Sequence, residues 1–247
     1  MAKQIIYGIG KALLRDFREP SKIIGYADLQ DLSVESSVSM DDITGGNKMF
    51  PIASFKKESG LKVSATSAVF NPEMIEYLDG ATGETGIAVM TEVMDISVPE
   101  DGVVTLEGTP VESTVVVSGM TVASGSAPEK GQYTISGSTV TFSKDDAGES
   151  VIIVYDYNSS ENAVTYALTE TSMTKPFIFD YMFPIYDEDT QQTHKAQLKI
   201  FKAQCSSGFK LNAQHRAPFA PQFEAAAKDP KRVDKKLWTL MIDGVEV

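Results

Sequence analysis

Two stretches in the first third of the chain alternate apolar and polar residues with a period of two. Leu32–Met40 has its apolar residues at even positions and Ser or Glu between them, and Leu61–Val69 alternates in the same way. A period of two places one apolar and one hydroxyl-rich face on a β-strand. The two stretches are therefore predicted to be strands that pair with each other, the first of them covering Asp31–Met40.

The connection between these two strands, Asp41–Gly60, is twenty residues long and carries an apolar centre. Connections of this length in compact domains are usually functional, because an exposed apolar tip is otherwise an aggregation hazard. We interpret the connection as a loop that contacts a partner surface. Its candidate contact residues are Gly45, Gly46, Met49, Phe50, Pro51 and Ile52.

One short helix is predicted directly after the second strand. Asn71 is its expected N-cap, Pro72 and Glu73 suit its first turn, and Gly80 ends it. A helix of about two turns is not stable alone and must pack against a sheet. A groove-binding role for this helix is the less favoured alternative.

The C-terminal part returns to strand-like patterns. Its candidate strands are Pro176–Ile185, His194–Gln204, Phe209–Gln214, Pro221–Lys228 and Lys236–Ile242. Helix propensity alone would favour a helix at Phe223–Lys228. A strand is predicted there instead, because Asp229–Arg232 has the composition of a turn between two strands.

The central segment Val103–Asp156 differs in composition: it is rich in Val, Thr and Ser, and Gly and Pro residues interrupt it. It predicts a small antiparallel unit. Its expected strands are Val103–Leu106, Val111–Val117, Gln132–Ile135, Thr139–Phe142 and Val151–Tyr157. The stretch Asp146–Ser150 partly matches the Asp-x-Gly-x-Tyr corner of immunoglobulin-like sandwiches, with Ser150 in place of the tyrosine.

Charge divides the chain more sharply than these patterns do. The whole chain has 34 acidic and 22 basic residues, a net charge of -12, which argues against a protein that binds nucleic acid by neutralising phosphates. Between residues 80 and 172 there are 14 acidic and two basic residues, whereas the rest has 20 of each. We therefore expect a scaffold made of residues 1–80 and 172–247, and an acidic β-rich insert at 81–171.

No catalytic or metal-binding constellation is evident. The two histidines, His194 and His215, fit no ligand spacing or nucleophile motif, and the one cysteine, Cys205, is expected to be a buried apolar residue. The N-terminal apolar stretch Ile5–Leu14 does not resemble a secretory signal, and no run is long enough to span a membrane. The sequence thus predicts a soluble protein that is not an enzyme, with no cofactor, no metal and no membrane contact.

The order of these parts resembles the major tail protein, or tail tube protein, of long-tailed bacteriophages over nearly the whole chain. The parts that carry the resemblance are Asp31–Met40, Asp41–Gly60, the helix from Asn71 to Gly80, Gly131–Phe142, Asp145–Gly148, Val151–Tyr157, Gly208–Asn212 and Phe219–Asp229.

The resemblance implies a mainly β fold: a tail-tube-type antiparallel β-sandwich or barrel subunit with one short flanking helix and a β-rich, immunoglobulin-like insert that projects outward. It implies hexameric rings that stack into a tube, with Asp41–Gly60 as the ring-to-ring contact, and DNA that passes through without specific binding. The expected partners are further copies of the chain and the tape measure, terminator and distal tail proteins. The expected location is the virion, assembled in the bacterial cytoplasm.

Two other readings remain open at this level. One is a virion decoration or binding module in which the central unit grips a carbohydrate or a host protein. The other is the tube subunit of a related contractile injection device. A structural subunit of the tail tube is preferred because the unpaired strand edges and the apolar loop would then gain partners.

Overall fold

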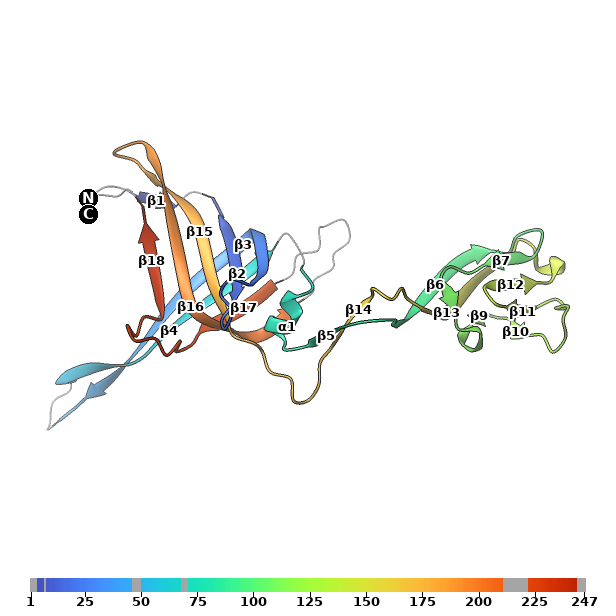
Figure 1. The fold of residues 1–247 in the computed structure, drawn as a ribbon, viewed down its shortest axis with the longest axis horizontal. Helices are drawn as coiled ribbons and strands as arrows, with labels where there is room; N and C mark the ends of the chain where they lie inside the picture. The colour runs from blue at the N-terminus through green and yellow to red at the C-terminus, as the bar shows by residue number, and fades with distance from the viewer. Residues whose placement is uncertain (1–3, 7, 46–49, 68–70, 211–221, 244–247) are drawn as a thin grey trace. The chain divides into compact units, whose positions relative to one another are not determined.

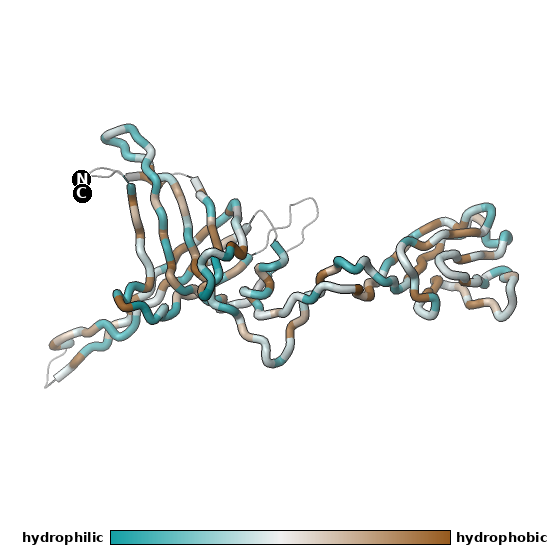
Figure 2. The backbone as a smooth tube through the Cα atoms, viewed as in Figure 1, coloured by the Kyte–Doolittle hydropathy of each residue, from teal (hydrophilic) through white to brown (hydrophobic). Residues whose placement is uncertain are grey.

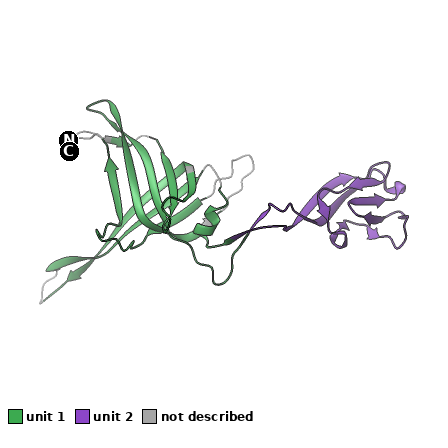
Figure 3. Cartoon of the chain, viewed as in Figure 1, with its two compact units in different colours: residues 1–82, 166–247 green, residues 83–165 purple. Residues whose placement is uncertain are grey.

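The structure is a computed structural model, and it describes residues 4–6, 8–45, 50–67, 71–210 and 222–243. The chain divides into two compact units (Figure 3). Unit 1 combines residues 1–82 and 166–247, and unit 2 consists of residues 83–165. The fold is mainly β with one short helix, as the sequence predicts.

Unit 1 is built on a ring of six antiparallel strands (Figure 1). Each strand pairs with the next in the order β15, β2, β3, β4, β17 and β16, and β16 pairs back onto β15. The six are β2 (Lys11–Asp16), β3 (Ile23–Ile43), β4 (Ala53–Ser67), β15 (Phe177–Asp187), β16 (Gln192–Lys210) and β17 (Gln222–Ala227). Two shorter strands, β1 (Gln4–Ile6) and β18 (Trp238–Ile242), attach to β15 and β16.

The core of unit 1 follows from alternation along these strands (Figure 2). Each strand of the ring contributes apolar side chains to one buried cluster, among them Leu14, Val63, Phe179, Ile200 and Phe223. Phe179 and Phe223 meet edge to face across the cluster, with ring centroids 6.3 Å apart. A closed ring removes the sheet edges that an open sheet would expose, so the barrel can be stable without a partner.

Helix α1 (Met74–Leu78) packs on this core through Met74, Tyr77 and Leu78, all buried. It begins later than the sequence predicts, because Glu73 and not Asn71 occupies the N-cap position. The Asn71 side chain accepts the Glu73 N–H at 3.1 Å and donates to the Ile24 carbonyl at 2.7 Å. Asn71 therefore ties the turn before the helix to β3.

The Tyr77 hydroxyl of α1 anchors the helix to the end of β2, donating to the Asp16 carboxylate at 2.8 Å. Burial and the neighbouring Asp16 charge both raise the pKa of Tyr77 well above its usual value. The phenol therefore stays protonated and keeps its donor at physiological pH.

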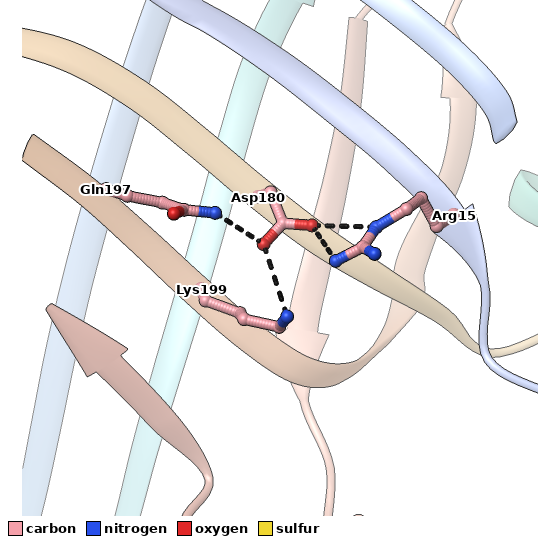
Figure 4. Close-up of polar contacts among 4 residues, drawn as sticks. All are labelled: Arg15, Asp180, Gln197 and Lys199. Atoms are coloured by element: carbon pink, nitrogen blue, oxygen red, sulfur yellow. Dashed lines mark hydrogen bonds and ion pairs between the residues drawn. The ribbon is translucent and has the colours of Figure 1, made fainter. Parts of the chain in front are cut away.

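A buried carboxylate joins three strands on the other face of β15 (Figure 4). Asp180 is only 1% exposed, and its oxygens accept from Arg15 Nε at 2.9 Å and from Gln197 Nε2 at 3.0 Å. Lys199 Nζ lies 3.9 Å away. A buried charge is tolerated only when it is paired and hydrogen-bonded, and both oxygens of Asp180 meet that condition.

Unit 2 contains two small sheets around its own core. One sheet has the order β10–β11–β12–β7, and in the other β13 pairs with β6, β8 and β9. The strands are β6 (Val89–Ser97), β7 (Val103–Thr105), β8 (Thr109–Pro110), β9 (Val116–Val117), β10 (Thr121–Val122), β11 (Gln132–Ser136), β12 (Thr139–Phe142) and β13 (Ser150–Asn158). Two further strands, β5 (Thr82–Thr85) and β14 (Val164–Ala167), pair with each other.

Several local predictions for unit 2 need correction. The expected strand Val111–Val117 is a 3-10 turn, Glu112–Thr114, followed by the two-residue β9. The unit is not wholly antiparallel, since β10 and β11 run parallel. The corner residue Asp146 is fully buried, and instead of forming a tyrosine corner its carboxylate accepts the Gly131 N–H at 3.0 Å.

The C-terminal strand predictions hold in type but not always in extent. Within the predicted strand Pro221–Lys228, residues Gln222–Ala227 form β17 against their helix propensity, because Phe223 and Ala225 enter the core. A separate strand was expected at Phe209–Gln214, but its first two residues are the end of β16. The remaining four lie outside the described residues.

Replacing Arg15 should show how much the buried carboxylate contributes to unit 1. Arg15→Met removes the side chain that donates two hydrogen bonds to Asp180, but Gln197 and Lys199 remain. We therefore expect the free energy of unfolding to fall by about 2–3 kcal/mol, which is less than the cost of leaving a buried charge with no partner. Urea unfolding measures this loss. The matched control is Arg232→Met, which breaks the exposed pair with Asp234 and should change stability little. Equal effects for the two variants would contradict the prediction.

Candidate assembly surface

The hairpin formed by β3 and β4 extends well beyond the barrel. The two strands pair from Leu29–Ser67 to Ile43–Ala53. The neighbour β2 pairs only with residues 23–28 of β3, and β17 pairs only with residues 62–66 of β4. Over the described chain, the outer edges of residues 29–43 and 53–61 therefore have no strand beside them. Figure 1 shows this part of the hairpin projecting from the barrel.

The predicted loop Asp41–Gly60 is mostly strand, so this prediction is wrong. β3 continues to Ile43 and β4 begins at Ala53, which leaves residues 44–52 as the connection. The sequence does not indicate the first part of β4, because charged residues, Lys56 and Lys57 among them, interrupt the alternation of apolar and polar positions. The strand segments 41–43 and 53–59 are exposed on both faces, so burial imposes no alternation of apolar and polar residues on them.

One face of the hairpin passes from core to solvent along its length. Val63, close to the barrel, is 1% exposed, whereas Val38 and Met40 further out are 56% and 55% exposed. All residues of 35–43 and 53–59 are exposed. An isolated two-stranded ribbon is at best marginally stable in water, so this extension depends on a further surface for its stability.

The opposite face carries small hydroxyl and charged side chains. Ser33, Ser37 and Ser39 of β3 are exposed and pair with Ser64, Gly60 and Glu58 of β4. Charges of both signs mix here and around the tip, including the ion pair of Lys57 with Asp41 at 3.4 Å. Such exposed pairs contribute little stability, and they leave this face hydrophilic and close to neutral.

The tip of the hairpin holds the candidate contact residues. Phe50 is 79% exposed and Ile52 is 58% exposed, while Phe55 beside them is 55% exposed. The Ile52 N–H donates to the Ile43 carbonyl at 2.7 Å, which continues the ladder past the last residues of the strands. Gly45 and Pro51 lie in the same connection. Gly46 and Met49 lie outside the described residues.

The described residues contain no group of His, Cys, Asp and Glu that could hold a metal ion. Cys205 is buried as expected, its thiol donates to the Glu224 carbonyl at 3.2 Å, and burial raises its pKa, so it is a poor nucleophile. His194 lies in β16, and His215 is not among the described residues. None of the helices described is long and apolar enough to cross a membrane.

A barrel whose longest hairpin projects with unpaired edges is typical of structural proteins that assemble by adding strands. The sequence profile of the YomU/Tube protein family, a phage tail tube protein family, matches residues 4–236. The chain therefore belongs to this family, which confirms the resemblance found in the sequence. Membership implies a structural, non-enzymatic role, self-assembly and a place in the phage tail. A comparison with curated proteins gave no match.

Matched valine substitutions should separate the part of the hairpin that stabilises the barrel from the part that does not. Val63→Ala should cost about 2 kcal/mol because it opens a cavity in the core. Val38→Ala should change the free energy of unfolding by less than about 0.5 kcal/mol, because its side chain is already in water. Urea unfolding of the monomeric chain measures both. A cost for Val38→Ala comparable to that of Val63→Ala would show that the extension is packed within its own subunit.

Proposed function

We propose that the chain forms hexameric rings that stack into the tube of a phage tail, and that the tube conducts DNA during ejection into the host. The observation that carries the proposal is the hairpin extension, which has exposed backbone edges and an exposed apolar face. Both features gain partners when neighbouring copies add strands to these edges, since added strands supply backbone hydrogen bonds and cover apolar side chains.

The two faces of the extension suit two environments. In the proposed tube, the apolar face with Val38 and Met40 packs on neighbouring protein, and the serine-rich face with Ser37 and Ser39 lines the channel. A hydrophilic, nearly neutral wall neither repels the DNA strongly nor holds it by phosphate contacts. This supports passage of DNA without specific binding.

Unit 2 has a different place in the proposal. It carries 13 acidic and two basic residues, a net charge of -11. Placing six such units beside DNA would bring like charges together, so the acidic unit is proposed to project outward from the tube. We infer that this unit corresponds to the acidic insert at 81–171 in a scaffold of residues 1–80 and 172–247, and the division of the chain into residues 83–165 and residues 1–82 with 166–247 supports this.

The remaining partners follow from the proposed tube. Its two ends would meet the tape measure, terminator and distal tail proteins, and the assembled protein would reside in the virion after assembly in the bacterial cytoplasm. Family membership and the projecting hairpin favour this tail tube over a decoration module.

Removing the hairpin tip should abolish stacking without unfolding the subunit. In a variant lacking Asn47–Phe55, the described part of the removed segment, residues 50–55, contributes nothing to the buried core, so circular dichroism and urea unfolding should match the parent chain. Negative-stain electron microscopy should show tubes of uniform width for the parent chain and rings or single subunits for the variant. The double variant Phe50→Asp and Ile52→Asp, which keeps the length, should behave in the same way.

Two outcomes would contradict the proposal. A parent chain that stays strictly monomeric at high concentration would argue against any tube. A tip deletion that unfolds the barrel would show that the tip belongs to the fold and not to an interface.

A further inference from the structure

A large groove lies on unit 1 away from the hairpin. Its volume is about 950 Å³, and residues from β2, β3, β15, β16 and β18 line it. Most of its wall is apolar and includes two flexible methionines, which adapt to the shape of an incoming surface. The apolar wall consists of Tyr26, Met182, Phe183, Pro184, Met241 and Ile242.

Two features show that this groove is unfilled in a single chain. Met241 is 45% exposed although it lines a concave surface. The Nε2 atom of His194, also on the wall, is buried and has no hydrogen-bond partner within the described part of the chain. A buried polar atom without a partner is costly, so an arriving group that bonds to it would be favoured.

The hairpin tip has the shape and chemistry to fill the groove. Phe50, Ile52 and Phe55 are the exposed apolar side chains of the tip, and no buried cluster of the described chain contains them. Figure 1 shows that the tip and the β15–β16 connection, which borders the groove, lie at opposite ends of unit 1. The tip of one chain can therefore meet the groove of another chain in a head-to-tail contact, which does not close on itself and so builds a stack.

Charge does not oppose this pairing. Asp41 and Asp42 lie close to the tip beside Lys56 and Lys57, and Asp41 pairs with Lys57. The groove wall carries Lys11, Lys195 and Asp243, and Lys11 pairs with Asp28. Charges of both signs therefore lie on both surfaces, and the contact is proposed to be mainly apolar.

We propose that the groove is the receptor for the hairpin tip, residues 50–55, of a second copy in the next ring. This inference rests on the proposed tube and names the surface that the tip contacts within it. Ile52 and Phe50 enter the apolar part of the groove beside Met241 and Met182.

Disulfide cross-linking between two differently tagged chains tests this contact. Both chains carry Cys205→Ala, one carries Ile52→Cys, and the other carries Met241→Cys. Under oxidising conditions that allow tubes, the mixture should give a covalent heterodimer on a non-reducing gel. A disulfide needs Cβ atoms about 3.8 Å apart, so only a seated tip can form it.

The matched control replaces Met241→Cys with Leu240→Cys. Leu240 is adjacent to Met241 in β18 and has a similar exposure, 49%, but it does not line the groove. Its heterodimer with Ile52→Cys should be much weaker. Equal cross-linking at Leu240 and Met241, or no cross-link in a sample that contains tubes, would overturn the groove assignment while leaving the proposed tube intact. A sample with neither tubes nor rings would count against the proposed function itself.

A second measurement does not depend on cysteine chemistry. Met241→Ser removes apolar contact from the groove, and the protein concentration needed for tubes should rise about tenfold or more. Rings should persist, and urea unfolding of the monomer should change little because Met241 is exposed there. Unchanged tube formation by Met241→Ser would contradict the proposal.

Discussion

The organisation of this protein depends on how its backbone hydrogen-bonding groups are satisfied at the edges of β3 and β4. Within the barrel, six pairings close a ring, and the peptide groups of those segments are bonded on both sides. The same two strands then leave the ring and run on as a two-stranded ribbon. The barrel is complete within one chain, whereas the ribbon leaves backbone groups of its two outer edges unpaired. In the proposed tube, neighbouring copies pair with the ribbon and leave the barrel unchanged.

That separation requires a firm base for the ribbon. The strands that flank β3 and β15 are held by contacts that do not depend on a partner: Asp180 joins β2, β15 and β16, and Tyr77 fixes helix α1 to Asp16 at the end of β2. A buried, fully hydrogen-bonded carboxylate discriminates strongly against misplaced neighbours, because any shift leaves a charge unpaired. The ribbon therefore leaves the barrel in a defined direction, which a repeating assembly needs from every subunit.

How much of this could be predicted from the sequence depends on burial. Period-two alternation identified β4 where Val63 and its neighbours enter the core, and the turn composition of Asp229–Arg232 favoured β17 over a helix. Residues 41–43 and 53–60 of the outer hairpin were mistaken for a loop, because their own chain buries neither face there and no alternation marks them. Hydrogen-bond partners that are distant in sequence were also missed. The residues around Asp180 in the chain give no indication of its partner Arg15, which lies 165 residues away. The same limit applies to the groove, whose wall is assembled from five strands.

The proposed contact residues at the tip could be picked out from the sequence for a physical reason. Phe50 and Ile52 stand out in sequence because apolar side chains beside Gly and Pro, outside any alternating run, have no place in a core of their own chain. Residues that do not contribute to the fold can be recognised because they break the pattern of apolar and polar positions along the chain. The acidic composition of residues 83–165 is an exception of the same kind, since the barrel does not require it. In the proposed tube, both exceptions concern what surrounds the subunit and not its own stability: neighbouring chains at the tip, and solvent or further partners around the acidic unit.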